Sequence, residues 1–165
     1  MSATATSSAT TSSTATARLA ALGLTLPPVP AAVAAYLPAV RQGDLVWTSG
    51  QLPFVDGALP ATGLVGEGEG LVTLQDAARM AGRCALNALA AAAAVADLDR
   101  LRIVKVVGFV ASAPGFTGQA KVVDGASSLL GDVFGDAGRH ARSAVGVAAL
   151  PLGAPVEIEL TAALV

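Results

Sequence analysis

The stretch His140–Val165, HARSAVGVAALPLGAPVEIELTAALV, carries the clearest structural pattern of the chain. Two runs rich in β-forming residues, Arg142–Leu150 and Pro155–Val165, flank the segment LPLGA, whose proline and glycine are typical turn residues. This pattern predicts a β-hairpin.

Side chains alternate between the two faces of a strand. In the first run this alternation puts Arg142 on one face with Ala144 and Gly146, and in the returning run it separates Glu157 and Glu159 from the aliphatic residues. If the two runs form a hairpin, the arginine and the carboxylates are expected on one face, above small residues that leave room for a ligand. The alternative is an ordinary solvated face with surface charges, and the pattern alone leaves both interpretations open.

Composition limits the class of protein. The chain has 165 residues, the length of one domain, with 53% hydrophobic and only 13% charged residues. Such an apolar surplus predicts an oligomer interface. The longest apolar run is shorter than the roughly 18 residues that a membrane span needs, so no membrane partner is expected.

Charge and ligand-forming residues exclude other partners. A net charge of −2, without a basic stripe, predicts that the protein does not bind nucleic acid. One cysteine and one histidine make a Cys/His metal site implausible, so we expect neither metal nor cofactor.

The N-terminal residues differ in composition from the rest. Residues 1–17 are almost entirely Ser, Thr and Ala, which predicts a disordered tail before a single domain over residues 18–165. The tail has neither the basic nor the apolar segment of a secretory signal, and a cytoplasmic location is therefore expected.

The order of the predicted elements gives the fold class. After a strand at Asp44–Ser49 and an Asp56-Gly57 turn, a helix capped by Thr73 runs to about Asp97, and its residue Asn87 lies off the apolar stripe and receives no role. A buried strand, Leu101–Ser112, a helix capped by Thr117 that runs to about Phe134, and the two C-terminal strands follow. This order predicts a two-layer α+β fold with the helices on one face of the sheet.

Two motifs carry a family resemblance. The sequence ARSAVGVAALP from Ala141, followed by VEIE from Val156, and the earlier WTSGQLP from Trp47, resemble the two signatures of the YjgF or Rid (reactive intermediate deaminase) family, also called endoribonuclease L-PSP. The resemblance covers roughly residues 36–165. It implies a chorismate-mutase-like fold with a mixed sheet and two helices on one face, and a homotrimer that packs through the other face, with active sites between subunits.

The resemblance also implies residue roles. Arg142 would clamp a substrate carboxylate and Glu157 would place the attacking water, while Tyr36, Ser49 and Gly50 would shape the pocket. Physical chemistry agrees with the first two roles, because a guanidinium matches a carboxylate at two points and a carboxylate is a suitable general base for imine hydrolysis. The expected partner is a small carboxylate-bearing metabolite.

Three residues depart from the family pattern. His140 replaces the usual proline, Ala144 replaces a cysteine, and Asp124 replaces an asparagine near the pocket, where its charge would repel an anionic substrate. Three hypotheses follow: a deaminase that converts 2-imino acids to 2-keto acids and ammonia, a non-catalytic binder of small metabolites, or an endoribonuclease. The last fits poorly, because the chain is acidic and has no pair of histidines for cleavage.

Overall fold

The structure is a computed structural model that describes residues 13–29 and 36–165. Its strands are β1 (Ala39–Gln42), β2 (Leu45–Thr48), β3 (Leu101–Ala111), β4 (Ala141–Val147) and β5 (Val156–Leu164), and its α-helices are α1 (Ala15–Ala21), α2 (Leu74–Ala93) and α3 (Gln119–Phe134). The strands form one sheet in the order β1-β2-β5-β3-β4, in which β3 and β4 run parallel and the other neighbours antiparallel.

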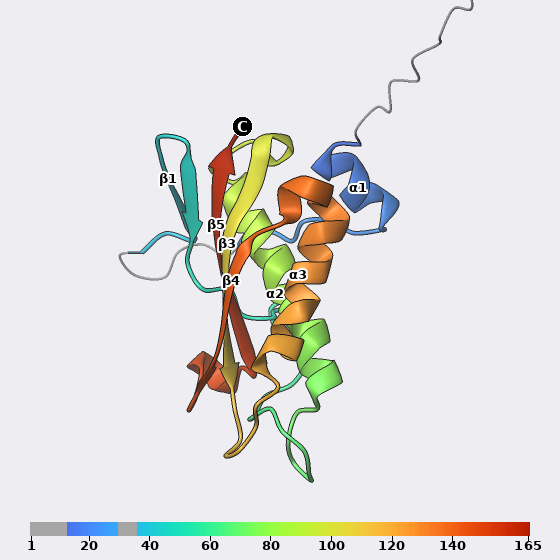
Figure 1. Cartoon of the computed structure of the whole chain (residues 1–165), viewed down its shortest axis with the longest axis vertical. Helices are drawn as coiled ribbons and strands as arrows, with labels where there is room; N and C mark the ends of the chain where they lie inside the picture. The colour runs from blue at the N-terminus through green and yellow to red at the C-terminus, as the bar shows by residue number, and fades with distance from the viewer. Residues whose placement is uncertain (1–12, 30–35) are drawn as a thin grey trace, which may run out of the picture.

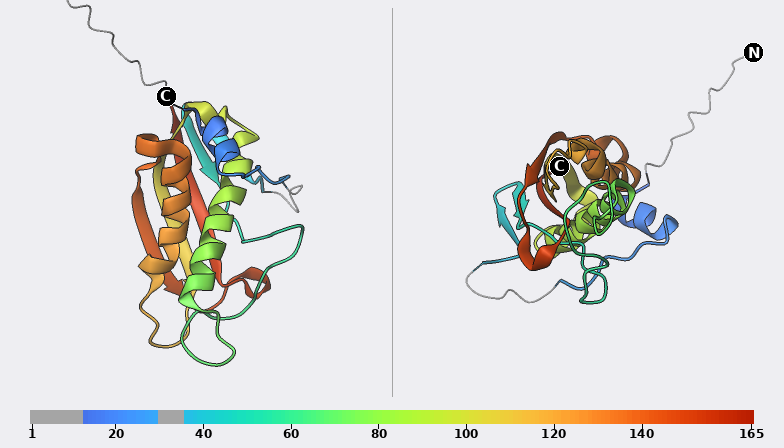
Figure 2. Two further views of the ribbon diagram at one scale, coloured as in Figure 1. Left: turned by 90° about the vertical axis from the view of Figure 1, so that its right-hand side faces the viewer. Right: turned by 90° about the horizontal axis from the view of Figure 1, so that it is seen from below.

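Helices α2 and α3 lie side by side on one face of this sheet (Figures 1 and 2). The predicted two-layer α+β arrangement, a mixed sheet with helices on one face, is therefore confirmed. None of the described helices is both long and apolar enough to span a membrane.

The predicted C-terminal hairpin is wrong, because β3 lies between β4 and β5. A parallel pair needs a crossover connection, and α3 supplies it between β3 and β4. The chain then passes over the end of β3 through the turn Pro151–Gly153, and β5 pairs with the other edge of β3 in the antiparallel sense.

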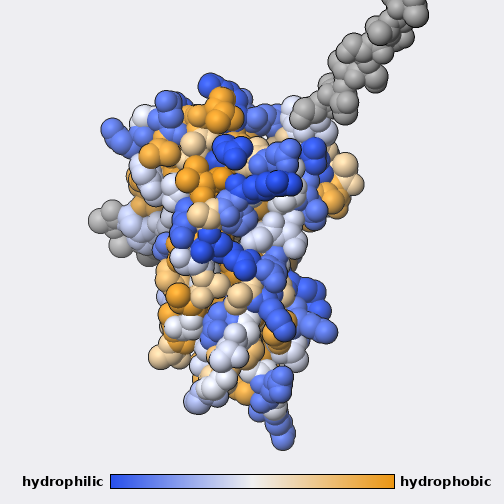
Figure 3. All heavy atoms as spheres, viewed as in Figure 1, coloured by the Kyte–Doolittle hydropathy of each residue, from blue (hydrophilic) through white to orange (hydrophobic). Residues whose placement is uncertain are grey.

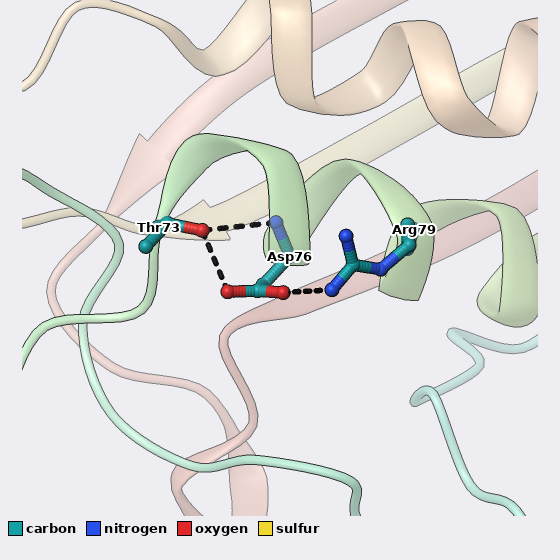
Figure 4. Close-up of polar contacts among 3 residues, drawn as sticks. All are labelled: Thr73, Asp76 and Arg79. Carbon is teal, nitrogen blue, oxygen red and sulfur yellow. Dashed lines mark hydrogen bonds and ion pairs between the residues drawn. The ribbon is translucent and has the colours of Figure 1, made fainter.

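The start of α2 agrees with its predicted cap. The Thr73 hydroxyl oxygen accepts a hydrogen bond from the Asp76 backbone N–H at 3.1 Å, and the same hydroxyl donates to the Asp76 carboxylate at 2.6 Å (Figure 4). Asp76 also pairs with Arg79 one turn later. The helix ends at Ala93, earlier than expected, because Asp97 instead caps the short 3₁₀ helix Leu98–Arg100.

The predicted cap of α3 is wrong. The helix begins at Gln119 after Gly118, and no side chain caps it. The ring of Phe116 packs so closely over Gly118 that a Cβ there would lie 2.7 Å from it. The space at this position therefore favours glycine over a capping side chain.

The first helix begins before the expected domain boundary. Ala15 and Leu19 of α1 are buried in the core, and the Thr14 side chain caps the helix at the Ala17 N–H. Ala15–Ala17, expected in the tail, are therefore helical, whereas the prediction for residues 1–12 lies outside the described residues.

The core lies between the sheet and the helices. The sheet contributes the buried residues Val46, Val106, Val110 and Ile158, and the helices contribute Leu89, Val122, Val123 and Leu130. No described element covers the other face of the sheet, where Val40, Leu45, Trp47 and Val145 keep 38–46% of their surface exposed. Figure 3 shows apolar residues, in orange, at the surface over the strands.

Candidate active site

Arg142 lies on the edge strand β4, on the face of the sheet that the helices cover. It pairs with Val106 of β3, which is fully buried in the core, and directly paired residues share a face. Its Nη1 donates to Asp124 Oδ1 at 2.7 Å and to Ser127 Oγ at 3.1 Å. The arginine is therefore held by two residues of α3, one of them a carboxylate.

A histidine extends this cluster. His140 Nε2 lies 3.0 Å from Ser127 Oγ, and its Nδ1 contacts the carbonyl oxygen of Gly138. Ser127, His140 and Arg142 line a shallow depression of about 350 Å³. The sequence gave no sign of Ser127, whose contribution depends on how α3 packs beside β4.

Glu157 lies on β5, on the uncovered face of the sheet. It pairs with Phe109 of β3, while its neighbour Ile158 is buried under the helices. Its carboxylate rests against Gly50, just after β2, so that a Cβ at Gly50 would lie 1.6 Å from Glu157 Oε1. A side chain at Gly50 would therefore displace the Glu157 carboxylate, and the structure brings these two predicted site residues together.

Backbone hydrogen bonds hold Gly50 and Glu157 together, and the surroundings of Glu157 shift its pKa. Gln51 exchanges two backbone hydrogen bonds with Ile158, at 2.9 and 3.1 Å, which holds Gly50 beside β5. Burial, and secondly the negative charge of Glu159, raise the pKa of the Glu157 carboxyl above its usual value. No described residue donates a hydrogen bond to the Glu157 side chain, so its oxygens are free to hold a water molecule.

The expectation that Arg142 and Glu157 share one face is wrong. The register pairs Val106 with Arg142 and Phe109 with Glu157, and residues 106 and 109 are separated by an odd number of positions along β3. The two side chains therefore point to opposite faces of the sheet within one chain. Ala144 shares the face of Arg142, because it pairs with the buried Gly108.

The remaining predicted residues lie before and after β2. Ser49 Oγ donates to the Leu37 carbonyl oxygen at 2.7 Å, and its backbone N–H donates to Pro38, so Ser49 fastens the segment that precedes β1. Tyr36, at the start of this segment, is 57% exposed. No hydrogen bond among the described residues joins Tyr36 to Arg142 or to Glu157.

Two side chains of α2 hold the loop that follows Gly50. Arg83 Nε donates to the Phe54 carbonyl oxygen at 2.7 Å, and Asn87 Nδ2 donates to those of Leu52 and Phe54 at 2.8 and 3.2 Å. The sequence assigned no role to Asn87, and only its position off the apolar stripe signalled a polar contact. Over residues 13–29 and 36–165, no group of three His, Cys, Asp or Glu side chains is placed to hold a metal ion.

Comparison with known proteins identifies the family. The model of the family described as "Endoribonuclease L-PSP" matches residues 28–164. The chain belongs to the endoribonuclease L-PSP family. This confirms the resemblance to YjgF and Rid proteins, and with it the fold class.

The L-PSP relatives cover most of the chain. Protein TCP17 of Trypanosoma cruzi is 45% identical over 146 residues, which are 87% of this chain and 89% of TCP17. The crystal structure of Atu1372 from Agrobacterium tumefaciens, a protein of unknown function, is 43% identical with a TM-score of 0.76 and covers 89% of each chain. Escherichia coli TdcF, crystallised with bound serine, is 27% identical with a TM-score of 0.57, over 83% of this chain and 94% of TdcF.

Proposed function

We propose that this L-PSP protein is an imine deaminase that hydrolyses 2-imino acids to 2-keto acids and ammonia without a cofactor. The observation that carries the proposal is the Glu157 carboxylate, which lies against Gly50 with no hydrogen bond from a described residue and with a raised pKa. A pKa closer to neutral makes a carboxylate a stronger base, and hence better able to activate water.

The proposed reaction needs one base and one binding group. A water held by Glu157 attacks the imine carbon and forms a C–O bond, while its proton passes to the carboxylate and from there to the imine nitrogen. The hydroxyl proton then passes through the carboxylate to the nitrogen, the C–N bond breaks as the C=O bond forms, and ammonia leaves the 2-keto acid. Imines of this kind already hydrolyse in water without a catalyst, so orientation and one general base are sufficient chemistry.

Arg142 is the proposed binding group for the substrate carboxylate. Asp124 and Ser127 accept hydrogen bonds only from its Nη1, and no described residue accepts one from Nε or Nη2. The edge formed by Nε and Nη2 matches the two oxygens of a carboxylate. Serine bound to TdcF supports an amino-acid-like ligand for the family. Tyr36, from the segment before β1, and Ser49, which follows β2 and holds that segment, are proposed to complete the pocket.

We further propose that the site lies between protomers of a homotrimer. In one protomer Arg142 and Glu157 face opposite sides of the sheet, so one small substrate cannot reach both. Arg142 lies on an edge strand, and the face that carries Glu157 also carries the exposed residues Trp47 and Val145. A second copy packed on this apolar face supplies the missing arginine. A cytoplasmic location belongs to the same proposal.

Glu157→Gln is expected to reduce imine hydrolysis by about a hundredfold or more, because a general base typically contributes 10²- to 10⁴-fold. The measurement is semicarbazide competition for imines that an amino acid oxidase generates from several amino acids. Wild-type activity should fall as the pH drops through the raised pKa of Glu157, since the protonated carboxyl cannot accept a proton. The Gln variant should lack this acidic limb, and a fully active Gln variant contradicts the assignment.

The raised pKa can be checked without activity. A carboxyl whose pKa is higher in the folded state stabilises the fold fully at low pH, and the contribution is lost as pH rises through the folded pKa. The Gln variant should therefore gain stability relative to the wild type at neutral pH, and the difference should vanish under acidic conditions.

Asp124→Asn is expected to lower the KM for 2-imino acids severalfold, because it removes a negative charge that competes for Arg142. Asp124 is largely exposed, so solvent screening limits the effect. Asp132→Asn, an exposed acid on the same helix without an ion pair among the described residues, is the matched control. An unchanged KM in both variants means that Asp124 does not act on substrate binding.

A second candidate function is a non-catalytic binder of small metabolites. The Arg142–Asp124 pair favours it, because Asp124 already accepts a hydrogen bond from Nη1 of the arginine. Binding of 2-keto acids through Arg142 by a protein that never hydrolyses imines supports this candidate over the deaminase. The endoribonuclease activity in the family description gains no support from the acidic chain, and we do not propose it here.

A further inference from the structure

A cavity of about 460 Å³ lies between the loop that follows Gly50 and helix α2. Its walls come from the side of α2 that carries Arg83, Asn87 and Ala90, from residues 27–29 and from the loop around Phe54. Figure 2 shows the N-terminal segment, in blue, passing beside α2. This volume falls within the range of small-molecule sites. Neither Arg142 nor Glu157 lines the cavity.

Two polar side chains, one helical turn apart on α2, reach this cavity. Asn87 donates through Nδ2 to two carbonyl oxygens, which determines the orientation of its amide, since neither partner is a donor. Its Oδ1 is buried and has no hydrogen-bond partner among the described residues. A buried acceptor without a partner is unusual in a native protein and calls for a donor from outside.

Arg83 brings a positive charge to the same cavity. Only its Nε is used, in the bond to Phe54, and no described carboxylate lies within salt-bridge distance of its guanidinium. Arg79, one turn earlier on α2, is instead paired with Asp76. Asp56, exposed at the cavity, supplies one charge of the opposite sign.

We propose that this cavity binds a 2-amino acid with an apolar side chain. The carboxylate pairs with the Nη atoms of Arg83, and the ammonium donates to Asn87 Oδ1 and lies in the negative field of Asp56. Residues i and i+4 of a helix are about 5–6 Å apart at Cβ, which suits two groups attached to the same carbon of one small ligand. The apolar side chain contacts Phe54, Pro27 and Ala90.

The loop that follows Gly50 connects this cavity to the candidate active site. The residues that Arg83 and Asn87 hold, Leu52 and Phe54, follow Gly50 and Gln51 in the chain. An amino acid in the cavity therefore stiffens the same loop that presents Gly50 to Glu157. The proposal concerns binding and does not depend on whether the protein hydrolyses imines.

The test uses L-leucine as the probe, with calorimetry and with NMR of the Arg83 Nε–H and Asn87 side-chain amide signals. We expect leucine to bind and to shift both signals, whereas 4-methylpentanoate, which lacks the amino group, and isoamylamine, which lacks the carboxylate, bind at least about tenfold more weakly. No binding of leucine at millimolar concentration, or equal binding of all three compounds, overturns the proposal.

Variants locate the site. Arg83→Gln keeps a donor for the Phe54 carbonyl oxygen but loses the charge, and should weaken leucine binding about tenfold or more. Arg79→Gln, on the same helix, should leave it unchanged. If Arg83→Gln impairs folding, Ala90→Leu fills the cavity instead and should block the probe. In Arg142→Ala the leucine-induced shift of the Arg83 Nε–H signal should persist, because Arg142 does not line this cavity. Loss of that shift in Arg142→Ala, or a retained leucine-induced shift of the Asn87 amide signals in Arg83→Gln, contradicts this site.

Discussion

Assemblies that mix Arg142→Ala and Glu157→Gln protomers are expected to recover imine hydrolysis that neither variant performs alone. Each change by itself should lower activity about a hundredfold, through loss of a charge-assisted contact in the first variant and of the general base in the second. The two groups face opposite sides of the sheet in one protomer, so a complete site needs the arginine of one copy and the glutamate of another.

The recovery has a defined size. When equal amounts of the two variants assemble at random, a site takes an intact arginine from one protomer in about half the cases and an intact glutamate from its neighbour in about half. About one quarter of wild-type activity should therefore return after the variants are unfolded and refolded together, or co-expressed. Mass spectrometry checks that mixed assemblies form.

The outcomes separate the parts of the proposal. Mixed assemblies without recovered activity, formed from two variants that are each inactive, mean that both groups act from the same protomer. A folded Arg142→Ala protein with full activity removes Arg142 from the site. Arg79→Ala is the control, since Arg79 also pairs with an acid on the surface, does not line the depression around Arg142, and should be fully active.

Gly125→Ala is expected to destabilise the protein by about 2–3 kcal/mol or more, because α2 and α3 touch through their backbones at this point. A Cβ at Gly125 would lie 1.9 Å from the Ala78 carbonyl oxygen and 2.7 Å from its carbonyl carbon. These are backbone atoms and cannot move aside as a side chain can, so the helices must separate. Thermal or urea unfolding measures the loss.

Gly131 provides the opposite control on the same helix. A Cβ at Gly131 meets nothing within 4 Å, and alanine is favoured over glycine inside a helix by roughly 0.5–1 kcal/mol. Gly131→Ala should therefore stabilise the protein. Equal effects of the two substitutions show that the helices do not meet at Gly125.

The elements of the fold were largely predictable because their signals are local. The alternation Val156, Ile158, Leu160 identified the buried face of β5, and the Asp56-Gly57 turn has positive φ at both residues, as a tight hairpin turn requires. The Thr73 cap likewise depends on residues three positions apart. Each of these patterns reports contacts within one element or one turn.

The site was only partly predictable. The motif around Gly50 and the position of Glu157 were sufficient to nominate both residues, and the structure brings them into contact. The contacts of Asn87 and Arg83 were missed, because their partners are backbone carbonyl oxygens of a loop about 30 residues away in the chain. Every residue has a backbone carbonyl, so the sequence does not show which one accepts a hydrogen bond. Asp124, expected to repel a ligand, proved to be paired with Arg142.

By itself, the sequence determined the two long helices and most of the strands, the apolar face of β5, and the family to which the chain belongs. Only the tertiary structure decided that β3 lies between β4 and β5, and that its register directs Arg142 and Glu157 to opposite faces. The physical reason is that side-chain alternation is a property of one strand. Strand order and register depend on contacts between segments far apart in the chain, and a shift of one residue moves a side chain to the other face.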